Sequence, residues 1–221
     1  MSRLINLVTS NHESTKRNYV QRMMHKKAEC MKEAKKYSFN YWDGPRKFGY
    51  GGYKYIPGKW TKVARKIIKK YKLKSNSKIL DAGCGKAFLL YEIKKILPKI
   101  TISGFDISKY GIKNAKKEIR KFLYVHDIKK KLPIKNNKFD LVISINCLHN
   151  LDQTNLGKAL KELSRVSKKQ FICVESFRNE IELFNLQCWA LTCQTFFSKK
   201  DWEFFLNQNK YRGDYEFIYF K

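Results

Sequence analysis

The sequence predicts an α/β protein built on a doubly wound, mostly parallel sheet of six or seven strands, preceded by a helical and aromatic-loop N-terminal extension. From residue 60 onward, short runs rich in Ile, Val and Leu alternate with segments of helical periodicity. One of these runs ends in Asp81 and leads directly into a Gly-x-Gly turn and a helical pattern. Such alternation, joined by right-handed crossovers, produces a parallel sheet with helices on both faces.

We expect the extension to comprise residues 1–58. A basic helical pattern covers 14–36, and its apolar stripe should face the core or a lid, with partner binding as the alternative. This stripe consists of Tyr19, Val20, Met23, Met24, Ala28 and Met31. Residues 39–60 combine chain-breaking glycine and proline with many aromatic side chains, which predicts a lid over a ligand. The alternative is an aromatic clamp that only docks the extension. The lid candidates are Asp43, Arg46, Tyr50, Tyr53 and Tyr55, with the tyrosines as hydrogen-bond donors.

Residues 59–221 should form the sheet domain, beginning with a helix at about 60–71. The patterns predict strands at 78–81, 100–105, 122–126, 139–145 and 170–175, and helices at 87–97, 109–120 and 153–166. A helix at 180–194, a helix capped by Ser198 and a strand at 214–220 should follow. Only this one strand is evident after the last helix, which leaves six strands unless another segment adds one. If it lies at the sheet edge, it is a plausible dimer contact.

The turn at residues 83–85 is typical of a site for a nucleoside-bearing cofactor. Glycine permits positive φ and lets the backbone approach a ligand, while the following helix directs its N-terminus at it. A nicotinamide-binding motif would need a third glycine where Phe88 stands, and the phosphate-loop motif does not occur.

The acid-x-Gly-x-Gly string at 81–85 resembles the first motif of class I S-adenosylmethionine-dependent methyltransferases, with Ala87 where that family often has a third glycine. The resemblance covers roughly residue 59 to the C-terminus and implies a Rossmann-like methyltransferase domain. It implies S-adenosyl-L-methionine as cofactor and S-adenosyl-L-homocysteine as product. The residues expected to hold the cofactor are Asp81, Gly83, Cys84, Gly85, Asp106, Ile107, Asp127, Ile128 and Asn146.

Several of these residues have a definite expected role. Asp81 is expected to accept a hydrogen bond from the cofactor's amino group, and Asp106 to accept hydrogen bonds from the ribose hydroxyls. The alternative for Asp106 is that it only caps the N-terminus of the next helix. The resemblance implies that Asp127 accepts from the adenine amino group while Ile107 and Ile128 sandwich the ring.

Three side chains are candidates for a catalytic base: His149 and, as weaker candidates, Asp43 and Glu175. His149 follows the fourth strand, in the crevice where open α/β sheets bind ligands, and an unperturbed imidazole titrates near neutral pH. The alternative is that His149 only forms local hydrogen bonds at the start of a helix. Glu175 ends the fifth strand and faces the same crevice.

The composition is strongly basic, with 47 Lys and Arg against 19 Asp and Glu and a net charge of +28. Residues 1–78 hold 21 basic and four acidic side chains. This excess suits an anionic acceptor, although a solvated basic face is the simpler interpretation. Six cysteines without CxxC or zinc spacing predict reduced thiols in a cytoplasmic protein, with no metal. The apolar run at 4–8 is too short for a signal segment or a membrane span.

The sequence thus predicts methyl transfer by in-line displacement to a small polar, anionic acceptor, with O-methylation favoured. The aromatic run at 41–55 and the segments at 190–197 and 213–218 look like a bacterial methyltransferase group of surface-polysaccharide and small-molecule pathways. This narrower resemblance implies a sugar or a phosphorylated metabolite as acceptor. The alternatives are an RNA or protein methyltransferase that docks through the basic extension, and a non-catalytic cofactor-binding partner module.

Overall fold

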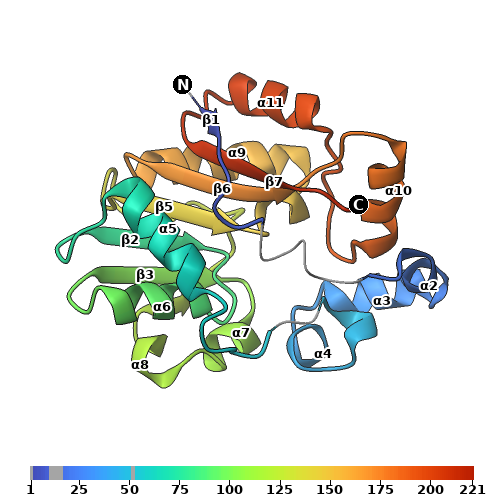
Figure 1. Cartoon of the computed structure of the whole chain (residues 1–221), viewed down its shortest axis with the longest axis horizontal. Coiled ribbons are helices and arrows are strands. Elements are labelled where there is room, and N and C mark those ends of the chain that lie inside the picture. The colour runs from blue at the N-terminus through green and yellow to red at the C-terminus, as the bar shows by residue number, and fades with distance from the viewer. Residues whose placement is uncertain (1, 10–16, 51–52) are drawn as a thin grey trace.

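The computed structural model describes residues 2–9, 17–50 and 53–221 (Figure 1). Its centre is a seven-stranded sheet of order β1-β7-β6-β5-β2-β3-β4, in which every neighbouring pair is parallel. The strands are β1 (Arg3–Leu4), β2 (Lys78–Ala82), β3 (Thr101–Asp106), β4 (Leu123–Val125), β5 (Leu141–Ile145), β6 (Gln170–Glu175) and β7 (Asp214–Ile218). The predicted α/β class and parallel sheet are therefore confirmed, and the seventh strand comes from the N-terminus.

Helices cover both faces of this sheet, as Figure 1 shows. Those of the sheet domain are α5 (Thr61–Tyr71), α6 (Phe88–Ile96), α7 (Lys109–Lys113), α8 (Lys117–Arg120), α9 (Gln153–Val166), α10 (Glu180–Trp189) and α11 (Lys199–Gln208), with a short 3₁₀ turn η2 (Leu148–Asn150). The extension contributes α2 (Tyr19–Met24), α3 (Lys27–Ala34), α4 (Phe39–Trp42) and the 3₁₀ turn η1 (Arg46–Phe48).

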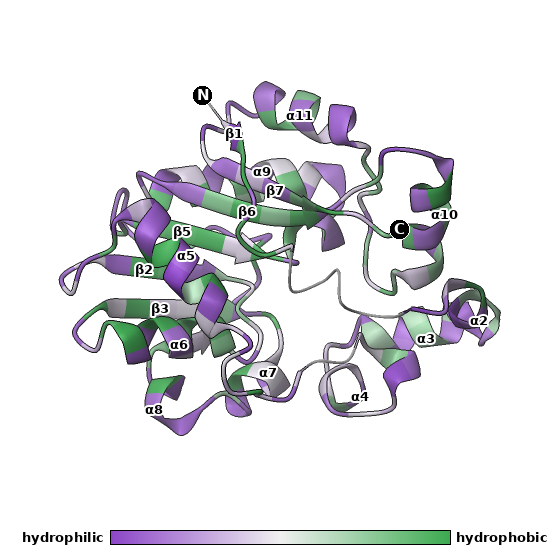
Figure 2. Cartoon of the chain, viewed as in Figure 1, coloured by the Kyte–Doolittle hydropathy of each residue, from purple (hydrophilic) through white to green (hydrophobic). Residues whose placement is uncertain are grey.

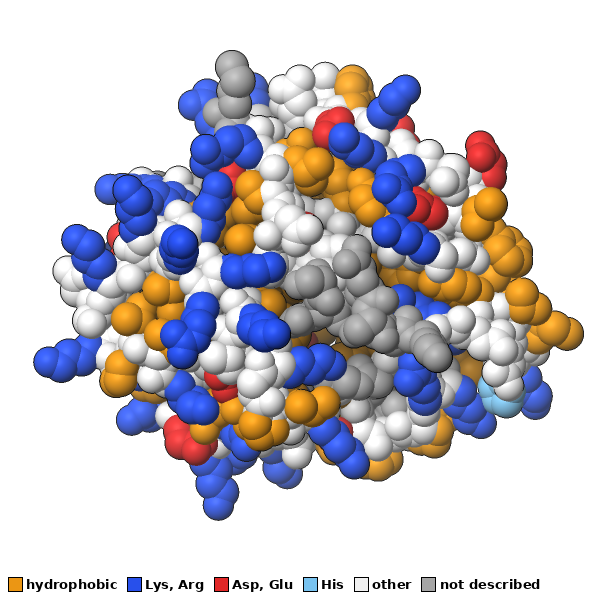
Figure 3. Space-filling view, viewed as in Figure 1, with side chains coloured by type: hydrophobic (Ala, Val, Ile, Leu, Met, Phe, Trp, Pro, Cys, Tyr) orange, Lys and Arg blue, Asp and Glu red, His pale blue; other side chains and the backbone are white. Residues whose placement is uncertain are grey.

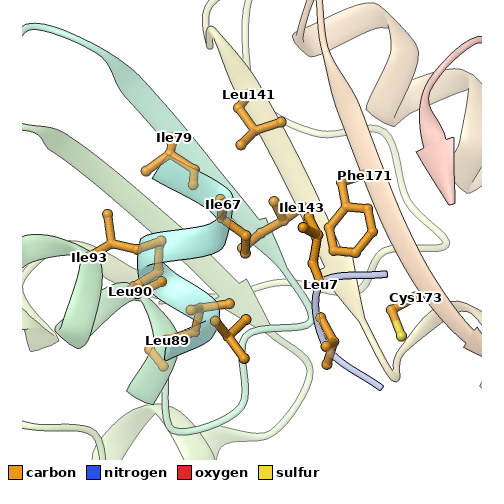
Figure 4. Close-up of a cluster of buried hydrophobic side chains, with 14 of the residues drawn as sticks. Leu7, Ile67, Ile79, Leu89, Leu90, Ile93, Leu141, Ile143, Phe171 and Cys173 are labelled. Carbon is orange, nitrogen blue, oxygen red and sulfur yellow. The ribbon is translucent and has the colours of Figure 1, made fainter. Parts of the chain in front are cut away.

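Two apolar layers flank the sheet because successive strand residues point to opposite faces. On β5, Leu141 and Ile143 join the cluster with α5 and α6, whereas Val142 joins the cluster with α9 and α11. Figure 4 shows Ile67 of α5 and side chains of α6 meeting β2, β5 and β6 in the first layer. Figure 2 shows the apolar colour concentrated on the central strands, which agrees with strands buried on both faces.

The chain order reverses between β2 and β5, because β2 is paired with β3 on one side and β5 on the other. Parallel strands end at the same edge, so the loops after β2, β3, β5 and β6 meet there. In open α/β sheets this reversal point is where ligands bind. The fold therefore places residues 83–87, 106–108, 146–149 and 175 around one crevice.

Two predictions about the extension were wrong. The pattern at 14–36 predicts one helix, but Lys26 adopts a left-handed conformation (φ 42°) and separates α2 from α3. The apolar stripe faces the core only in part, since Val20, Met23 and Met24 are exposed whereas Tyr19 and Met31 pack against buried clusters. Residues 14–16 of that helix and residues 51–52 of the predicted lid lie outside the described residues.

In the sheet domain, some helix boundaries also differ from the predicted ones. The pattern at 109–120 forms two short helices, α7 and α8, and the helix predicted at 180–194 ends at Trp189 because Ala190 is extended. The C-terminal strand is not the sheet edge, since β1 pairs with β7, which removes the reason for a dimer contact there. As β1 lies in the predicted extension yet joins the sheet, the boundary at residue 58 stays a prediction. Within 2–9, 17–50 and 53–221, no helix is both long and apolar enough to cross a bilayer.

Candidate cofactor and acceptor site

A cavity of about 680 Å³ opens at the carboxyl ends of the strands. This volume is typical of small-molecule sites. Of the residues singled out in the sequence, those that line it are Arg46, Tyr50, Tyr53, Asp81, Gly83, Cys84, Gly85, Asp106, Ile107, Asp127, Ile128, Asn146, His149 and Glu175. Asp43 and Tyr55 are not part of this lining.

The turn after β2 requires both of its glycines. Gly83 has φ +81° and Gly85 has φ +56°, a region that side chains disfavour. A Cβ on Gly83 would collide with Sγ of Cys147, and one on Gly85 would lie 2.6 Å from the Trp42 ring. The turn is therefore a bare backbone surface at the cavity wall.

Asp106, at the end of β3, organises this turn. Its Oδ2 accepts from the Gly85 N–H at 2.8 Å, and its Oδ1 accepts from the Ser108 N–H at 2.8 Å. Ser108, rather than Asp106, caps α7, because its Oγ accepts from the Gly111 N–H at 2.9 Å. Burial raises the pKa of the Asp106 carboxyl, although the two N–H donors oppose this. Each carboxylate oxygen has two lone pairs, so both can still accept from a ligand hydroxyl.

The other predicted cofactor residues surround the same space. Asp81 is 5% exposed, and burial together with the charge of Asp106 raises its pKa to about 8. Oδ1 of Asp127 accepts from the Lys129 N–H at 2.9 Å, which holds the loop after β4. Ile128 is buried, whereas Ile107 is 48% exposed and presents free apolar surface to the cavity.

The lid segment is attached to the glycine turn by Trp42 and Asp43. Nε1 of Trp42 donates to Oγ of Ser108 at 2.7 Å. Nζ of the buried Lys86 donates to both Asp43 oxygens at 2.6 and 2.7 Å, and the Tyr110 hydroxyl donates to Oδ2 at 2.8 Å. Burial opposes ionisation of Asp43, but the bonds from Lys86 and Tyr110 outweigh it and lower the pKa of Asp43. Asp43 is thus an ion-pair partner in a latch between lid and turn.

The three tyrosines predicted as lid donors lie in different places. The Tyr50 hydroxyl accepts from the backbone N–H groups of Leu191 and Thr192 at 2.7 and 3.1 Å, so it docks the lid on the segment after α10. Tyr53 packs against Trp42 with ring centroids 4.6 Å apart. The Tyr55 hydroxyl donates to Glu92 of α6, away from the cavity.

Glu175 and His149 meet on the other side of the cavity. Nδ1 of His149 accepts from the backbone N–H of Glu175 at 3.2 Å, so a neutral ring carries its proton on Nε2. Nε2 lies 3.4 Å from Oε2 of Glu175. That oxygen is buried and forms no hydrogen bond to the described residues. Burial raises the pKa of Glu175 to about 7, although the charges of Arg17 and Lys27 oppose this.

Among the cavity residues that sequence reasoning missed are Trp42, Lys86 and Trp189. Trp42 stands in the aromatic run and Lys86 follows the second glycine, but nothing in the local pattern pairs either with a distant segment. Trp189 ends α10, and the guanidinium groups of Arg17, Arg22 and Arg46 lie 5.4, 4.5 and 5.6 Å from its ring.

Comparison with known proteins agrees with this geometry. A family model described as "Methyltransferase domain" matches residues 73–215. The chain is 35% identical over 92 residues to the malonyl-[acyl-carrier protein] O-methyltransferase of Legionella pneumophila. The aligned residues cover 40% of this chain and 32% of that protein. It is 29% identical over 133 residues to the demethylmenaquinone methyltransferase of Staphylococcus saprophyticus, covering 58% and 56%.

Among solved structures, a putative methyltransferase from Bacillus halodurans superposes with a TM-score of 0.54 at 19% identity, covering 66% of this chain and 67% of that one. This likeness concerns the fold alone. The chain spans about a third to just over half of the length of the curated relatives it matches. The family model covers well over half of the chain, so the protein belongs to the methyltransferase domain family.

Proposed function

We propose that this enzyme methylates a hydroxyl oxygen of a small anionic acceptor, and that Glu175 is the base that takes the hydroxyl proton. The single observation that carries this proposal is the nearly buried carboxyl of Glu175, which lines the cavity and whose enclosed Oε2 forms no hydrogen bond to the described residues. Such a carboxylate can accept a proton from a bound hydroxyl. An amine acceptor has less need of a base, since it attacks through a lone pair that is already available.

The cavity fits the cofactor. The bare turn at Gly83 and Gly85 admits close approach of a ligand, and Asp106 offers paired oxygens to a ribose. We propose that Asp81 holds the amino group and that Asp127, Ile107 and Ile128 hold the adenine. When bound, S-adenosylmethionine supplies a methyl group on a positively charged sulfur. The further residues in this proposal are Cys84 and Asn146, which line the cavity beside these groups.

The acceptor belongs on the side of β5 and β6. Glu175 ends β6, two strands from β2, which corresponds to roughly 10 Å across the sheet. A molecule bound there lies next to the cofactor rather than on top of it. Holding an acceptor oxygen against the methyl carbon supplies much of the rate of such a displacement.

His149 has a positioning role in this proposal. Its Nδ1 is engaged by the Glu175 backbone, so the ring has its proton, not its free lone pair, on the side of the carboxylate. A base with a pKa of about 7 is well matched to proton transfer near neutral pH. These contacts favour Glu175 over His149 as the base.

Basic side chains in the cavity wall support an anionic acceptor. Arg17, Lys35 and Arg46 of the extension line the cavity together with Lys59. They suit a carboxylate or phosphate group, in agreement with the sugar or phosphorylated acceptor implied by the narrower resemblance. The lid packed on the turn leaves a cavity of small-molecule size, which argues against RNA or protein as acceptor. Six free thiols fit the predicted cytoplasmic location.

The test combines a methyl-donor assay with calorimetry. With an acceptor found by screening acidic sugars and phosphorylated metabolites, Glu175→Gln should lower kcat by a factor of roughly 10²–10⁴, as expected for loss of a general base. Its affinity for S-adenosylhomocysteine should stay within about twofold of wild type, whereas Asp106→Asn should weaken binding by about 1–3 kcal/mol. Full activity of Glu175→Gln would refute the base, and unchanged binding by Asp106→Asn would refute the ribose contact.

A further inference from the structure

The short helix α2 presents its apolar side chains to solvent. Met24 is 80% exposed, Val20 54% and Met23 38%. None of the residues of α2 is buried. These three residues belong to the apolar stripe that the sequence predicts to face the core.

Two cationic side chains of the same segment, Arg22 and Lys27, point inward instead. The Arg22 guanidinium donates to the backbone carbonyls of Trp189, Arg46 and Gly49 at 3.1, 2.9 and 2.9 Å. Nζ of Lys27 donates to the carbonyl of Cys188 at 2.6 Å. These bonds fix α2 in this orientation, so the outward direction of its apolar residues is built into the fold rather than a result of loose packing.

Helix α10, which packs against α2, also carries exposed apolar side chains. Ile181 is 72% exposed and Phe184 50%. Figure 3 shows apolar side chains along the right edge of the molecule, where Figure 1 places α10 and α2. We call the group of Val20, Met23, Met24, Ile181 and Phe184 the α2–α10 face. Several large apolar side chains gathered on one surface are typical of an interaction site.

Charge decides which partner fits this face. The net charge of the chain is +28, and Lys26 and Lys36 of the adjoining segment have side chains that are 76% and 59% exposed. A second copy of the chain would carry the same positive charge and be repelled. Nucleic acid would match the charge but would offer nothing apolar to Met24 or Phe184. An anionic lipid bilayer matches both, because its headgroups attract Lys and Arg while its acyl boundary accepts apolar side chains.

We propose that the α2–α10 face docks the enzyme on the surface of an anionic lipid bilayer, with Val20, Met23, Met24, Ile181 and Phe184 inserted at the headgroup level. The contact is peripheral and does not depend on which acceptor is methylated. Trp189, at the end of α10, joins this face to the cavity wall. Docking therefore brings the wall of the acceptor side close to the bilayer.

The experiment is co-sedimentation of the full chain with lipid vesicles. Wild type should bind vesicles of equal parts phosphatidylglycerol and phosphatidylcholine, and should not bind phosphatidylcholine alone. Met24→Glu should reduce the partition coefficient about tenfold or more, because an inserted apolar side chain becomes a charge repelled by the lipid. Phe204→Glu is the matched control, since Phe204 is 66% exposed on α11 outside the face and should leave binding unchanged.

Calorimetry with S-adenosylhomocysteine shows whether each variant is folded, independently of the acceptor. Unchanged lipid binding by a folded Met24→Glu would overturn the proposal, because lysines alone would then account for the attraction. A lipid-free dimer in sedimentation equilibrium that Met24→Glu dissociates would also overturn it, and would assign the face to a second copy.

Discussion

Two buried carboxyls at the cavity, Asp81 and Glu175, hold their protons far more tightly than exposed ones do. Burial raises the pKa of Asp81 to about 8 and that of Glu175 to about 7. For Asp81 the neighbouring charge of Asp106 adds to burial, whereas for Glu175 Arg17 and Lys27 oppose it. A cationic ligand group near Asp81 would reverse the first shift, because it favours the ionised carboxylate.

Glu175 should make the stability of the protein depend on pH. Its pKa is raised from 4.5 to about 7 on folding, so the folded state binds the proton more tightly. The resulting stabilisation is complete below pH 4.5 and is lost as pH rises through 7. Glu175→Gln removes this titration. Between those limits the wild type should therefore lose about 3 kcal/mol of unfolding free energy relative to Glu175→Gln.

Urea unfolding of both proteins at a series of pH values measures this difference. Asp81 titrates in both, so its contribution cancels. A difference between wild type and variant that stays constant over this range would show that Glu175 is ionised, and hence that it is not held in the neutral form by burial.

The residues of the glycine turn could be predicted from sequence, because their chemistry is local. Asp81, Gly83, Gly85 and Asp106 stand at fixed distances along a strand-turn-helix-strand unit, and the structure brings them to one cavity. The contact between His149 and Glu175 could not be predicted from sequence. It depends on which imidazole nitrogen accepts from the Glu175 backbone N–H. That contact arises only when β5 and β6 pair.

At the scale of elements, we expect the latch between α4 and the glycine turn to govern access to the proposed cofactor site. Asp43→Asn leaves the buried Lys86 ammonium without its charged partner, which should loosen the lid. We expect S-adenosylhomocysteine to dissociate roughly tenfold faster, measured by stopped-flow fluorescence of Trp42, because losing a buried charge pair acts mainly on the off-rate. The control is Glu33→Gln, which removes an exposed ion pair with Lys36 in the same extension.

If Asp43→Asn lowered the melting temperature but left the dissociation rate unchanged, the latch would only anchor the extension. That result would favour the aromatic clamp over the lid.

Strands and long helices of the sheet domain were predictable because their periodicity reports burial. The patterns at 153–166 and 170–175 match α9 and β6 at both ends. The N-terminal strand β1 carried no such signal, since its two residues, Arg3 and Leu4, are both exposed. Arg3 joins β7 through an ion pair with Asp214 at 3.2 Å. Such an element is specified by residues more than 200 positions away, which a local pattern does not contain.

At the scale of the whole molecule, one carboxylate ties the N-terminal segment to the sheet. Glu216 of β7 is 2% exposed, and its oxygens accept from the backbone N–H groups of Leu7, Val8 and Thr9 at 2.6–3.0 Å. The Thr9 hydroxyl also donates to it. This cluster of donors around one buried charge explains how β1 is held beside β7, the position that the C-terminal strand alone would leave as an open edge.

Glu216→Gln should therefore lower the unfolding free energy by about 3 kcal/mol, because a neutral amide accepts fewer and weaker bonds and turns N–H donors toward other donors. Glu118→Gln, on the exposed face of α8, should change it by less than about 0.5 kcal/mol. The decisive measurement is a double-mutant cycle with a chain lacking residues 2–9. If Glu216 acts through that segment, Glu216→Gln should cost far less in the shortened chain than in the full one. Equal costs in both chains would mean that Glu216 stabilises β7 by itself, and that the N-terminal segment rests on the sheet without contributing to it.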